Sequence, residues 1–410
     1  MKRPRLPVRP LRLPAPVRAE KQLKGCETMA QKVRISLGEP VIIAQAEPSV
    51  RNWGPYQFPS LDRLPGGELH CRYHVELDSA TAYGKDGGHA VSRDNGKTWS
   101  PAPPHTTGGL VLPNGDRIAI ANKKAFSLRP DELPKEILCE AILNSYRVPL
   151  YDPDCIAREY SGRFLTREKA GTGEWAEERH DIHIPFEARI VMENLLPLPN
   201  ISRLRLAPDG TLWMICYPFT YKDRKAGMAA AFLASKDCGH SWEYRSSVYY
   251  VPDKKDRFWA LRTGFTEPDI AFLPDGSLMC ILRTDDSFNR GPSYCAYSSD
   301  GGYTWSSPER FDDRGVWPCF LTLKHGVTLL GYGRWGQFLR ATADPSGRVW
   351  DDRIAIVEPD GDYENTCAYS DLFPLSDDTA YMVYSYFDEP NAAGEKCKTI
   401  LGRTVKTGRQ

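Results

Sequence analysis

The sequence predicts an all-β protein, built as a six-bladed β-propeller. Three observations predict this fold class: a repeated eight-residue motif, a repeated hairpin signal, and scarce helical periodicity outside one segment. The chain of 410 residues contains 33 Pro and 33 Gly, as expected for short strands joined by many turns. Its apolar content of 41% and charged content of 26% are ordinary for a soluble globular protein.

The eight-residue motif has the pattern Ser-x-Asp-x-Gly-x-x-Trp. It occurs at Ser92–Trp99, Ser235–Trp242 and Ser298–Trp305, and a worn copy at Thr342–Trp350 carries one extra residue before the Trp. The Asp can accept hydrogen bonds from turn amides, the Gly permits a positive φ, and the Trp can bury its ring against a neighbouring sheet. Each copy is therefore expected to staple a β-hairpin.

A second repeat consists of six strand–turn–strand signals, with a tight turn between alternating apolar residues. The turns begin at Leu64, Leu112, Ala207, Leu273, Leu323 and Leu375. Four of the five intervals measure about 50 to 65 residues, which suits a four-stranded blade. The wide interval predicts an insertion over residues 123–195, with a short helix at Asp131–Leu143 followed by polar strands. This insertion could form a lid over a pocket or a subunit contact.

Two parts are expected along the chain, a leader over residues 1–28 and the propeller over residues 29–410. The leader is Pro-rich and holds eight basic side chains against two acidic ones, a net charge of +6. Its basic charge could contact nucleic acid, but its composition favours a disordered tail, and it lacks the apolar core of a secretory signal. Met29, directly before the first strand-like segment, is an alternative start of translation.

The eleven cysteines are an odd number and form no Cys-x-x-Cys pair. Several lie in apolar strand-like runs, namely Cys71, Cys216, Cys280 and Cys319. Buried reduced thiols and a cytoplasmic location are therefore expected. No apolar run approaches the roughly 20 residues that span a membrane.

The repeated motif matches the Asp box, or bacterial-neuraminidase repeat, of the sialidase superfamily, which the chain resembles from about Val41 to its C-terminus. The resemblance implies that the boxes lie on the propeller face away from the substrate. They therefore identify the fold, and the chemistry must be sought in other residues.

A carboxylate and an arginine stand at the outer ends of one predicted hairpin. Glu267 opens one strand and Arg283 closes the next, and such ends lie side by side in an antiparallel pair. In the sialidase superfamily, a Glu at this place partners a tyrosine nucleophile and an Arg grips the substrate carboxylate. Glu267 and Arg283 match those positions in type and spacing; an ordinary surface ion pair is the alternative.

Tyr369 resembles the superfamily's Tyr-Ser nucleophile and lies just before the last hairpin signal. A phenol, with a pKa of about 10, becomes a useful nucleophile when an adjacent carboxylate takes its proton. A tyrosine also avoids the repulsion that an Asp or Glu nucleophile would meet at an anomeric carbon bearing a carboxylate. A buried structural tyrosine is the alternative.

The resemblance assigns a further clamp arginine to Arg334, with Arg340 as the alternative nearer the motif. Two guanidinium groups can hold one carboxylate in a fixed geometry. The chain departs from the superfamily in its first blade, where Gln57 replaces the first arginine of a three-arginine clamp. Either Arg262 compensates for this loss of charge, or the substrate is a different acidic sugar.

The resemblance also places the general acid in the first blade, between the Gln57 segment and the first motif. The candidates are Glu76, Asp78 and Asp86. Asp78 best fits the superfamily's spacing, and Asp86 fits nearly as well when the motif is used for alignment. A general acid needs its pKa raised by burial.

These residues together predict an exo-acting, retaining glycoside hydrolase that removes a terminal sialic acid or a related nonulosonic or uronic acid. A carbohydrate is the only partner expected: no cofactor, nucleic acid or membrane is required, and the oligomeric state is left open. His180 and His183 lack further ligands, so no metal site is expected there. Two alternatives remain open: a carbohydrate-binding propeller without turnover, favoured by Gln57, and a lyase or trans-glycosylase on the same scaffold.

Overall fold

The computed structural model describes residues 32–79, 85–122, 125–143, 146–285, 291–361 and 363–409. The leader and Met29 lie outside the described residues. Within them the chain is mainly β-structure, with short 3-10 helices at Pro153–Cys155, Arg158–Tyr160 and Trp259–Leu261. None of the helices in these ranges is long and apolar enough to cross a membrane.

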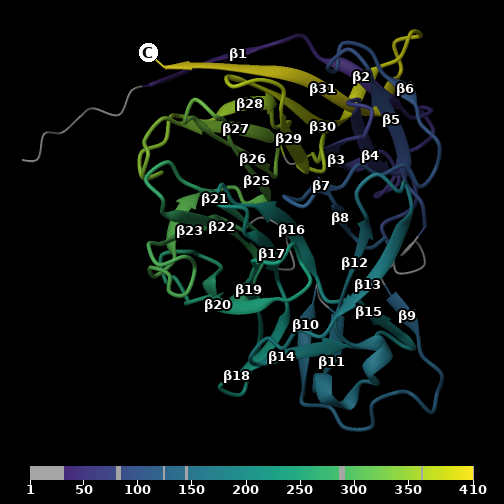
Figure 1. The fold of residues 1–410 in the computed structure, drawn as a ribbon, viewed down its shortest axis with the longest axis vertical. Coiled ribbons are helices and arrows are strands. Elements are labelled where there is room, and N and C mark those ends of the chain that lie inside the picture. Colours follow the sequence, from purple (N-terminus) through teal and green to yellow (C-terminus); the bar gives the residue numbers. More distant parts are fainter. Residues whose placement is uncertain are drawn as a thin grey trace, which may run out of the picture. The chain divides into compact units, whose positions relative to one another are not determined.

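The strands form six antiparallel blades that follow one another along the chain (Figure 1). Blade 1 contains β3 (Gln57–Arg63), β4 (Leu69–His74), β5 (Gly88–Ser92) and β6 (Ser100–Pro101), and blade 2 contains β7 (Leu110–Val111), β8 (Arg117–Ile120), β12 (Arg163–Glu168) and β13 (Trp175–His180). Blade 3 contains β16 (Ile201–Leu206), β17 (Leu212–Cys216), β19 (Lys225–Ser235) and β20 (Glu243–Tyr249), and blade 4 contains β21 (Gly264–Phe272), β22 (Leu278–Asp285), β23 (Ser293–Ser298) and β24 (Glu309–Asp312). Blade 5 contains β25 (Val316–Thr322), β26 (Thr328–Gly333), β27 (Gln337–Thr342) and β28 (Ile354–Val357), and blade 6 contains β29 (Ser370–Pro374), β30 (Thr379–Pro390) and β31 (Lys396–Arg409). The predicted six-bladed β-propeller is confirmed.

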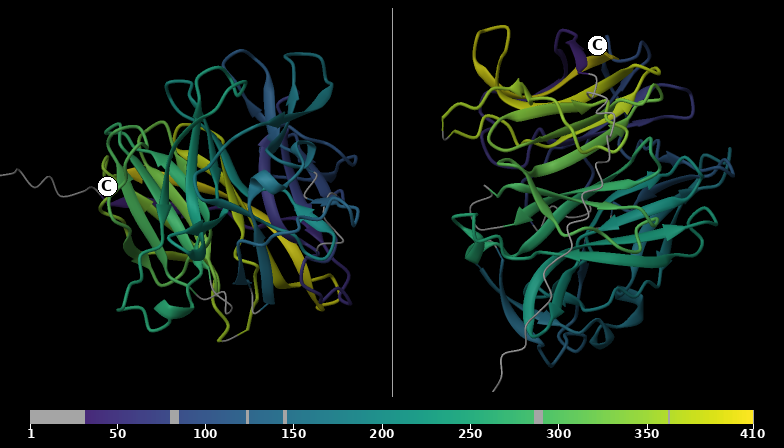
Figure 2. Two further views of the ribbon diagram at one scale, coloured as in Figure 1. Left: turned by 90° about the horizontal axis from the view of Figure 1, so that it is seen from below. Right: turned by 90° about the vertical axis from the view of Figure 1, so that its left-hand side faces the viewer.

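The first described strands complete the last blade. Both β1 (Val33–Leu37) and β2 (Val41–Gln45) pair with β31, and Figures 1 and 2 show these purple strands beside the yellow C-terminal ones. The inner strand β3 of blade 1 in turn contacts β29 and β30 of blade 6. The two ends of the described chain are therefore held in one sheet, next to the blade that follows β2.

All six predicted hairpin turns are present and share one hydrogen bond. The backbone N–H of the first turn residue donates to the carbonyl oxygen four residues later, as at Leu273 to Ser277 and at Leu323 to Val327. The other four turns, which begin at Leu64, Leu112, Ala207 and Leu375, have the same bond. The second repeat therefore marks the connection between the first two strands of every blade.

The three intact copies of the eight-residue motif also share one geometry. In each, the Ser Oγ accepts from the Gly N–H at 2.7 to 2.9 Å, and the Asp carboxylate accepts from a turn N–H at 2.9 to 3.0 Å. Each Trp packs against the preceding blade: Trp99 on Tyr381, Trp242 on His180, and Trp305 on Phe232. The motif thus stabilises both its own turn and a contact between blades.

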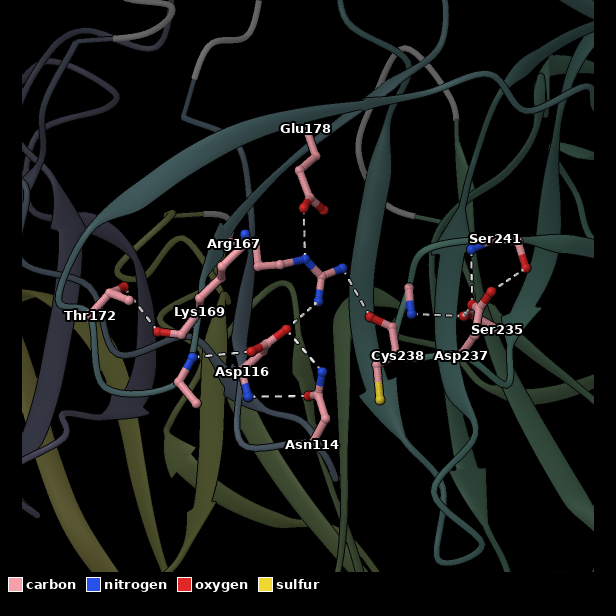
Figure 3. Close-up of polar contacts among 12 residues, drawn as sticks. Asn114, Asp116, Arg167, Lys169, Thr172, Glu178, Ser235, Asp237, Cys238 and Ser241 are labelled. Atoms are coloured by element: carbon pink, nitrogen blue, oxygen red, sulfur yellow. Dashed lines mark hydrogen bonds and ion pairs between the residues drawn. The ribbon is translucent and has the colours of Figure 1, made fainter.

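Figure 3 shows how a side chain adds to such a contact between blades 2 and 3. Arg167 of β12 donates to the carbonyl oxygen of Cys238, inside the second motif, at 2.9 Å. The same guanidinium pairs with Glu178 at 2.7 Å and with Asp116 at 3.3 Å. Arg167 is buried, and these carboxylates compensate its charge.

The wide interval supplies β12 and β13 of blade 2 and a separate set of strands. These are β9 (Ala125–Ser127), β10 (Cys139–Leu143), β11 (Tyr146–Tyr151), β14 (Glu187–Ile190) and β15 (Leu195–Pro197). The strand order β10-β11-β14-β18-β19, in which β18 is Phe219–Lys222, joins this set to blade 3. We call β10, β11, β14 and β15 the insertion wall.

The helix predicted at Asp131–Leu143 is wrong. Its first part forms turns and bends, and its second part is strand β10, which pairs with β11. Pro134 lacks an N–H and disfavours a helix through this segment, and pairing with β11 satisfies the backbone of the residues after it.

Blade 4 carries the predicted site residues at one end and the hairpin turn and the eight-residue motif at the other. In blade 4, β21 runs from Gly264 to the turn at Leu273, and β22 returns so that Arg283 pairs with Thr266. Glu267 and Arg283 therefore lie at one end of the blade. The turn lies at the other end, together with the motif at Ser298–Trp305, which follows β23.

Candidate active site

Four residues occupy equivalent positions in blades 1, 4, 5 and 6, near the start of the innermost strand. Phe58, Glu267, Trp317 and Tyr369 each stand six residues before the first residue of their hairpin turn. The φ angles of Phe58, Glu267 and Trp317 are 55°, 47° and 46°, and each precedes a Pro where the strand register shifts. A bulge of this kind re-aims a side chain, and positive φ at these residues is strained. Such backbone strain typically accompanies functional sites.

The Glu267 carboxylate is the centre of this group. The Tyr369 hydroxyl donates to Glu267 Oε1, and Arg283 Nη1 donates to the same oxygen at 2.6 Å. The Trp317 N–H donates to Oε2 at 3.0 Å. Glu267 is buried, with 6% of its surface exposed, so both of its oxygens depend on these protein donors.

These contacts set the protonation of the pair. Burial opposes ionisation of Glu267, but the charge and hydrogen bond of Arg283, with those from Tyr369 and Trp317, outweigh it and lower its pKa. Burial and the neighbouring Glu267 charge raise the pKa of Tyr369 well above its usual value. At neutral pH the proton therefore rests on the phenol, and the carboxylate is ionised and hydrogen-bonded to it. A phenol hydrogen-bonded to an ionised carboxylate is the geometry that the predicted roles of the two residues require.

Aromatic side chains fix the Tyr369 ring. Trp317 stacks on it with ring centroids 4.5 Å apart at 19°, and Phe58 meets it edge-on at 4.7 Å and 76°. The Arg203 guanidinium lies 4.6 Å from the Trp317 ring centroid. The phenol oxygen is thus held in one direction by packing as well as by Glu267.

A cavity of about 950 Å³ opens over this group. Glu267, Arg283, Arg334 and Tyr369 line it. Arg334 donates from Nη2 to the Cys367 carbonyl at 2.7 Å, and its guanidinium lies 4.9 Å from the ring centroid of Trp53. The structure therefore brings the predicted nucleophile, its base and two clamp arginines to one cavity.

Of the three candidates for the general acid, Asp78 alone lines this cavity. It is exposed and accepts a hydrogen bond from Trp53 Nε1 at 3.1 Å. Asp86 instead accepts from the His105 N–H at 2.9 Å and pairs with its ring, and Glu76 pairs with Lys85 at 3.4 Å. Asp78 therefore lacks the burial expected of a general acid, and only its place at the cavity favours it over the other two.

The structure does not bring Gln57, Arg262 or Arg340 to the cavity wall. Gln57 is fully buried, its Oε1 accepts from the Gly54 N–H at 3.2 Å, and Phe58 is the residue of β3 that lines the cavity. Arg262 donates to Asp256 at 2.7 Å within a buried pair, so its charge is already compensated. Arg340 donates to the Asp351 carbonyl at 2.8 Å.

Sequence reasoning missed several cavity residues. Phe58 had a usable signal, and so had Trp317, which stacks on Tyr369 without lining the cavity, because each precedes a Pro and stands at the same distance from its turn as Glu267. Trp53 lies in a loop before β3, and Arg189 lies in the insertion wall, where no repeat position marks it. Among the described residues there is no group of three or more His, Cys, Asp or Glu suited to a metal ion.

Comparisons with known proteins place the fold. A protein of unknown function from Dyadobacter fermentans DSM 18053 is similar with a TM-score of 0.63 and 20% identity, over 91% of this chain and 99% of that one. The Hadza microbial sialidase Hz136 is similar with a TM-score of 0.50 and 16% identity, over 86% of this chain and 65% of that one. No protein-family model and no curated protein sequence matches the chain. At these identities the likeness is one of fold alone, which the chain shares with a sialidase.

Proposed function

We propose that the protein is a retaining exo-glycosidase that releases a terminal acidic sugar, with Tyr369 as nucleophile and Glu267 as its base. The hydrogen bond from the Tyr369 hydroxyl to the ionised Glu267 carboxylate, at the wall of the cavity, is the observation that carries this proposal. A structural tyrosine needs no buried carboxylate held by an arginine and a backbone N–H.

The reaction proceeds in two steps. Tyr369 Oη attacks the anomeric carbon, Glu267 takes the phenol proton, and Asp78 gives its proton to the leaving oxygen as the glycosidic bond breaks. In the second step a water molecule gives a proton to Asp78 and its oxygen attacks the anomeric carbon, so that the bond between this carbon and Tyr369 Oη breaks. The phenol oxygen leaves and regains its proton from Glu267, so the enzyme is restored.

Two cavity arginines support an acidic substrate. Arg283 and Arg334 are buried, with 6% and 5% exposed, and guanidinium groups bind carboxylates through charge-assisted hydrogen bonds. Sialic acids, other nonulosonic acids and uronic acids all carry the required carboxylate. The described cysteines are free thiols, which supports a reducing, cytoplasmic setting for this activity.

The test is hydrolysis of a panel of aryl glycosides of sialic acid, the deaminated nonulosonic acid and uronic acids. Turnover of one of them by the wild type and its loss in Tyr369→Phe supports the proposal. Tyr303→Phe is the matched control, because Tyr303 is exposed, does not line the cavity, and donates from its hydroxyl to Glu243 at 2.8 Å. Loss of turnover in both variants alike, or in neither, contradicts the role of Tyr369.

The same panel tests the two other functions. Tight binding of an acidic sugar without any turnover identifies a carbohydrate-binding propeller. An unsaturated or anhydro product identifies a lyase, and transfer to an added sugar acceptor identifies a trans-glycosylase.

A further inference from the structure

The insertion wall carries a buried arginine without a carboxylate of its own. Arg189 of β14 is 5% exposed and lines the cavity. Its one hydrogen bond within the described ranges runs from Nη2 to the Pro197 carbonyl at 2.7 Å, and no ion pair with a described residue is formed. A guanidinium has five N–H donors, so most of those on Arg189 are left for a group inside the cavity.

Glu187, the nearest acidic residue on β14, already forms an ion pair with another arginine. Glu187 Oε1 accepts from Arg163 Nη2 at 2.8 Å, and both side chains of this pair are buried. Burial lowers the pKa of Arg189 to about 10, and the Glu187 charge offsets only part of that effect. Buried charges are ordinarily paired, because an unpaired one loses its hydration without compensation.

Arg147 also lies on the insertion wall but differs from Arg189 in its burial and in its pairing. It is exposed, and Glu140 pairs with it at 3.0 Å. Of the two arginines that the insertion wall adds to the cavity, Arg189 alone is buried and unpaired among the described residues.

The sheet register separates the backbone of Arg189 from that of Glu267 by several strands. Ala188 pairs with Phe219, Phe219 with Met228, and Met228 with Gly264. These three strand spacings amount to roughly 14 Å between Ala188 and Gly264, which lies three residues before Glu267 on β21. A backbone span of this length suits an anionic group on a second sugar better than one on the sugar held at Tyr369. The cavity volume of about 950 Å³ is also near the upper end of small-molecule sites.

We propose that Arg189 binds a carboxylate or sulfate group on the leaving-group part of an acidic oligosaccharide. The proposal rests on the proposed function, since an exo-acting enzyme holds the terminal sugar at its nucleophile and all other sugars on the leaving side. The substrate then carries two anionic groups, one held by Arg283 and Arg334 and the other by Arg189. The insertion wall is the part of the chain that selects the second.

The experiment compares two ligands by calorimetric titration in the Tyr369→Phe background, which needs no turnover. The ligands are N-acetylneuraminyl-galactose and the same disaccharide with a sulfate on the galactose; glucuronyl-galactose and its sulfated form serve as a second pair. The sulfated member should bind about tenfold or more tightly, because a charged hydrogen bond is gained. Adding Arg189→Met should bring its affinity down to that of the unsulfated disaccharide.

Control variants keep the result decisive. Arg158→Met removes an exposed arginine that pairs with Asp181 at 2.8 Å and does not line the cavity, so it should keep the preference for sulfate. Arg189→Lys should keep a smaller preference, because an ammonium lacks the guanidinium fork, and it replaces Arg189→Met if that variant fails to fold. A preference that survives in both Arg189 variants unchanged, or no preference in the parent protein, overturns the proposal. If only proteins with Arg189 prefer the sulfated ligand and the wild type hydrolyses no substrate of the panel, the anion site at Arg189 is supported and the hydrolase proposal is contradicted.

Discussion

The substitution Glu267→Gln tests the role of the central carboxylate most directly. It changes one oxygen of a buried side chain into an amide nitrogen and removes the negative charge that Arg283 and Tyr369 both face. The amide retains an oxygen that Arg283 can use as an acceptor. It does not accept a proton from the phenol, whose pKa burial keeps high.

The expected magnitudes follow from these contacts. Loss of a general base lowers kcat by about 10²- to 10⁴-fold, which corresponds to about 3 to 5 kcal/mol of transition-state stabilisation. Loss of one charged hydrogen bond in a buried place should lower the free energy of unfolding by about 1.5 to 3 kcal/mol. The loss of rate should therefore greatly exceed any loss of folded protein at room temperature.

The assay is a double-mutant cycle with Tyr369→Phe, in which kcat and the urea midpoint are both measured. If Glu267 acts through the phenol, adding Glu267→Gln to Tyr369→Phe costs little further activity. Additive losses would refute the reasoning, because they would show that Glu267 has a separate task. Glu178→Gln is the matched control: Glu178 also pairs with a buried arginine, at 2.7 Å from Arg167, but does not line the cavity.

Three further predictions concern pH, substrate binding and stability. The pKa of Glu267 is lower in the folded than in the unfolded protein. Its contribution to stability is therefore complete above the unfolded pKa and is lost as pH falls through the folded pKa. The free energy of unfolding, measured by acid denaturation, should fall less over this pH range in Glu267→Gln than in the wild type. Arg334→Met should raise KM for an acidic substrate about tenfold or more with a smaller change in kcat, measured by steady-state kinetics, and an unchanged KM contradicts a clamp role. Asp237→Ala should lower the free energy of unfolding by about 1 kcal/mol in urea titrations, because the turn N–H and Oγ of Ser241 lose their acceptor, and kcat should stay the same.

The fold could be predicted from the sequence because both repeats are formed by interactions between residues close together in the chain. The turn at Leu273 and the motif at Ser298–Trp305 are each closed by hydrogen bonds within a few residues, so their geometry can be read from the residue types. Glu267 was found as the carboxylate that opens a strand opposite Arg283, and Tyr369 through its resemblance to the superfamily's Tyr-Ser segment just before the last hairpin signal. These parts of the prediction needed no knowledge of distant contacts.

The parts that could not be predicted depend on which groups meet in the folded chain. Strand β10 forms through pairing with β11, which the composition of Asp131–Leu143 does not reveal. Arg262 was considered as a substitute clamp, yet Asp256, six residues before it, takes its guanidinium. Arg189 gives no sequence signal, because its environment is set by Pro197 and by the pairing of β14 with β11 and β18.

The equivalent placing of Phe58, Glu267, Trp317 and Tyr369 has an evolutionary consequence. Phe58, Glu267 and Tyr369 line the cavity from the start of their inner strands, whereas the hydrogen bonds that close the turns lie at the far ends of those strands. Exchange of the residue at the start alters the lining of the cavity and leaves the turn intact. Selection can therefore diversify ligand specificity and preserve foldability independently, at separate positions of the same strand.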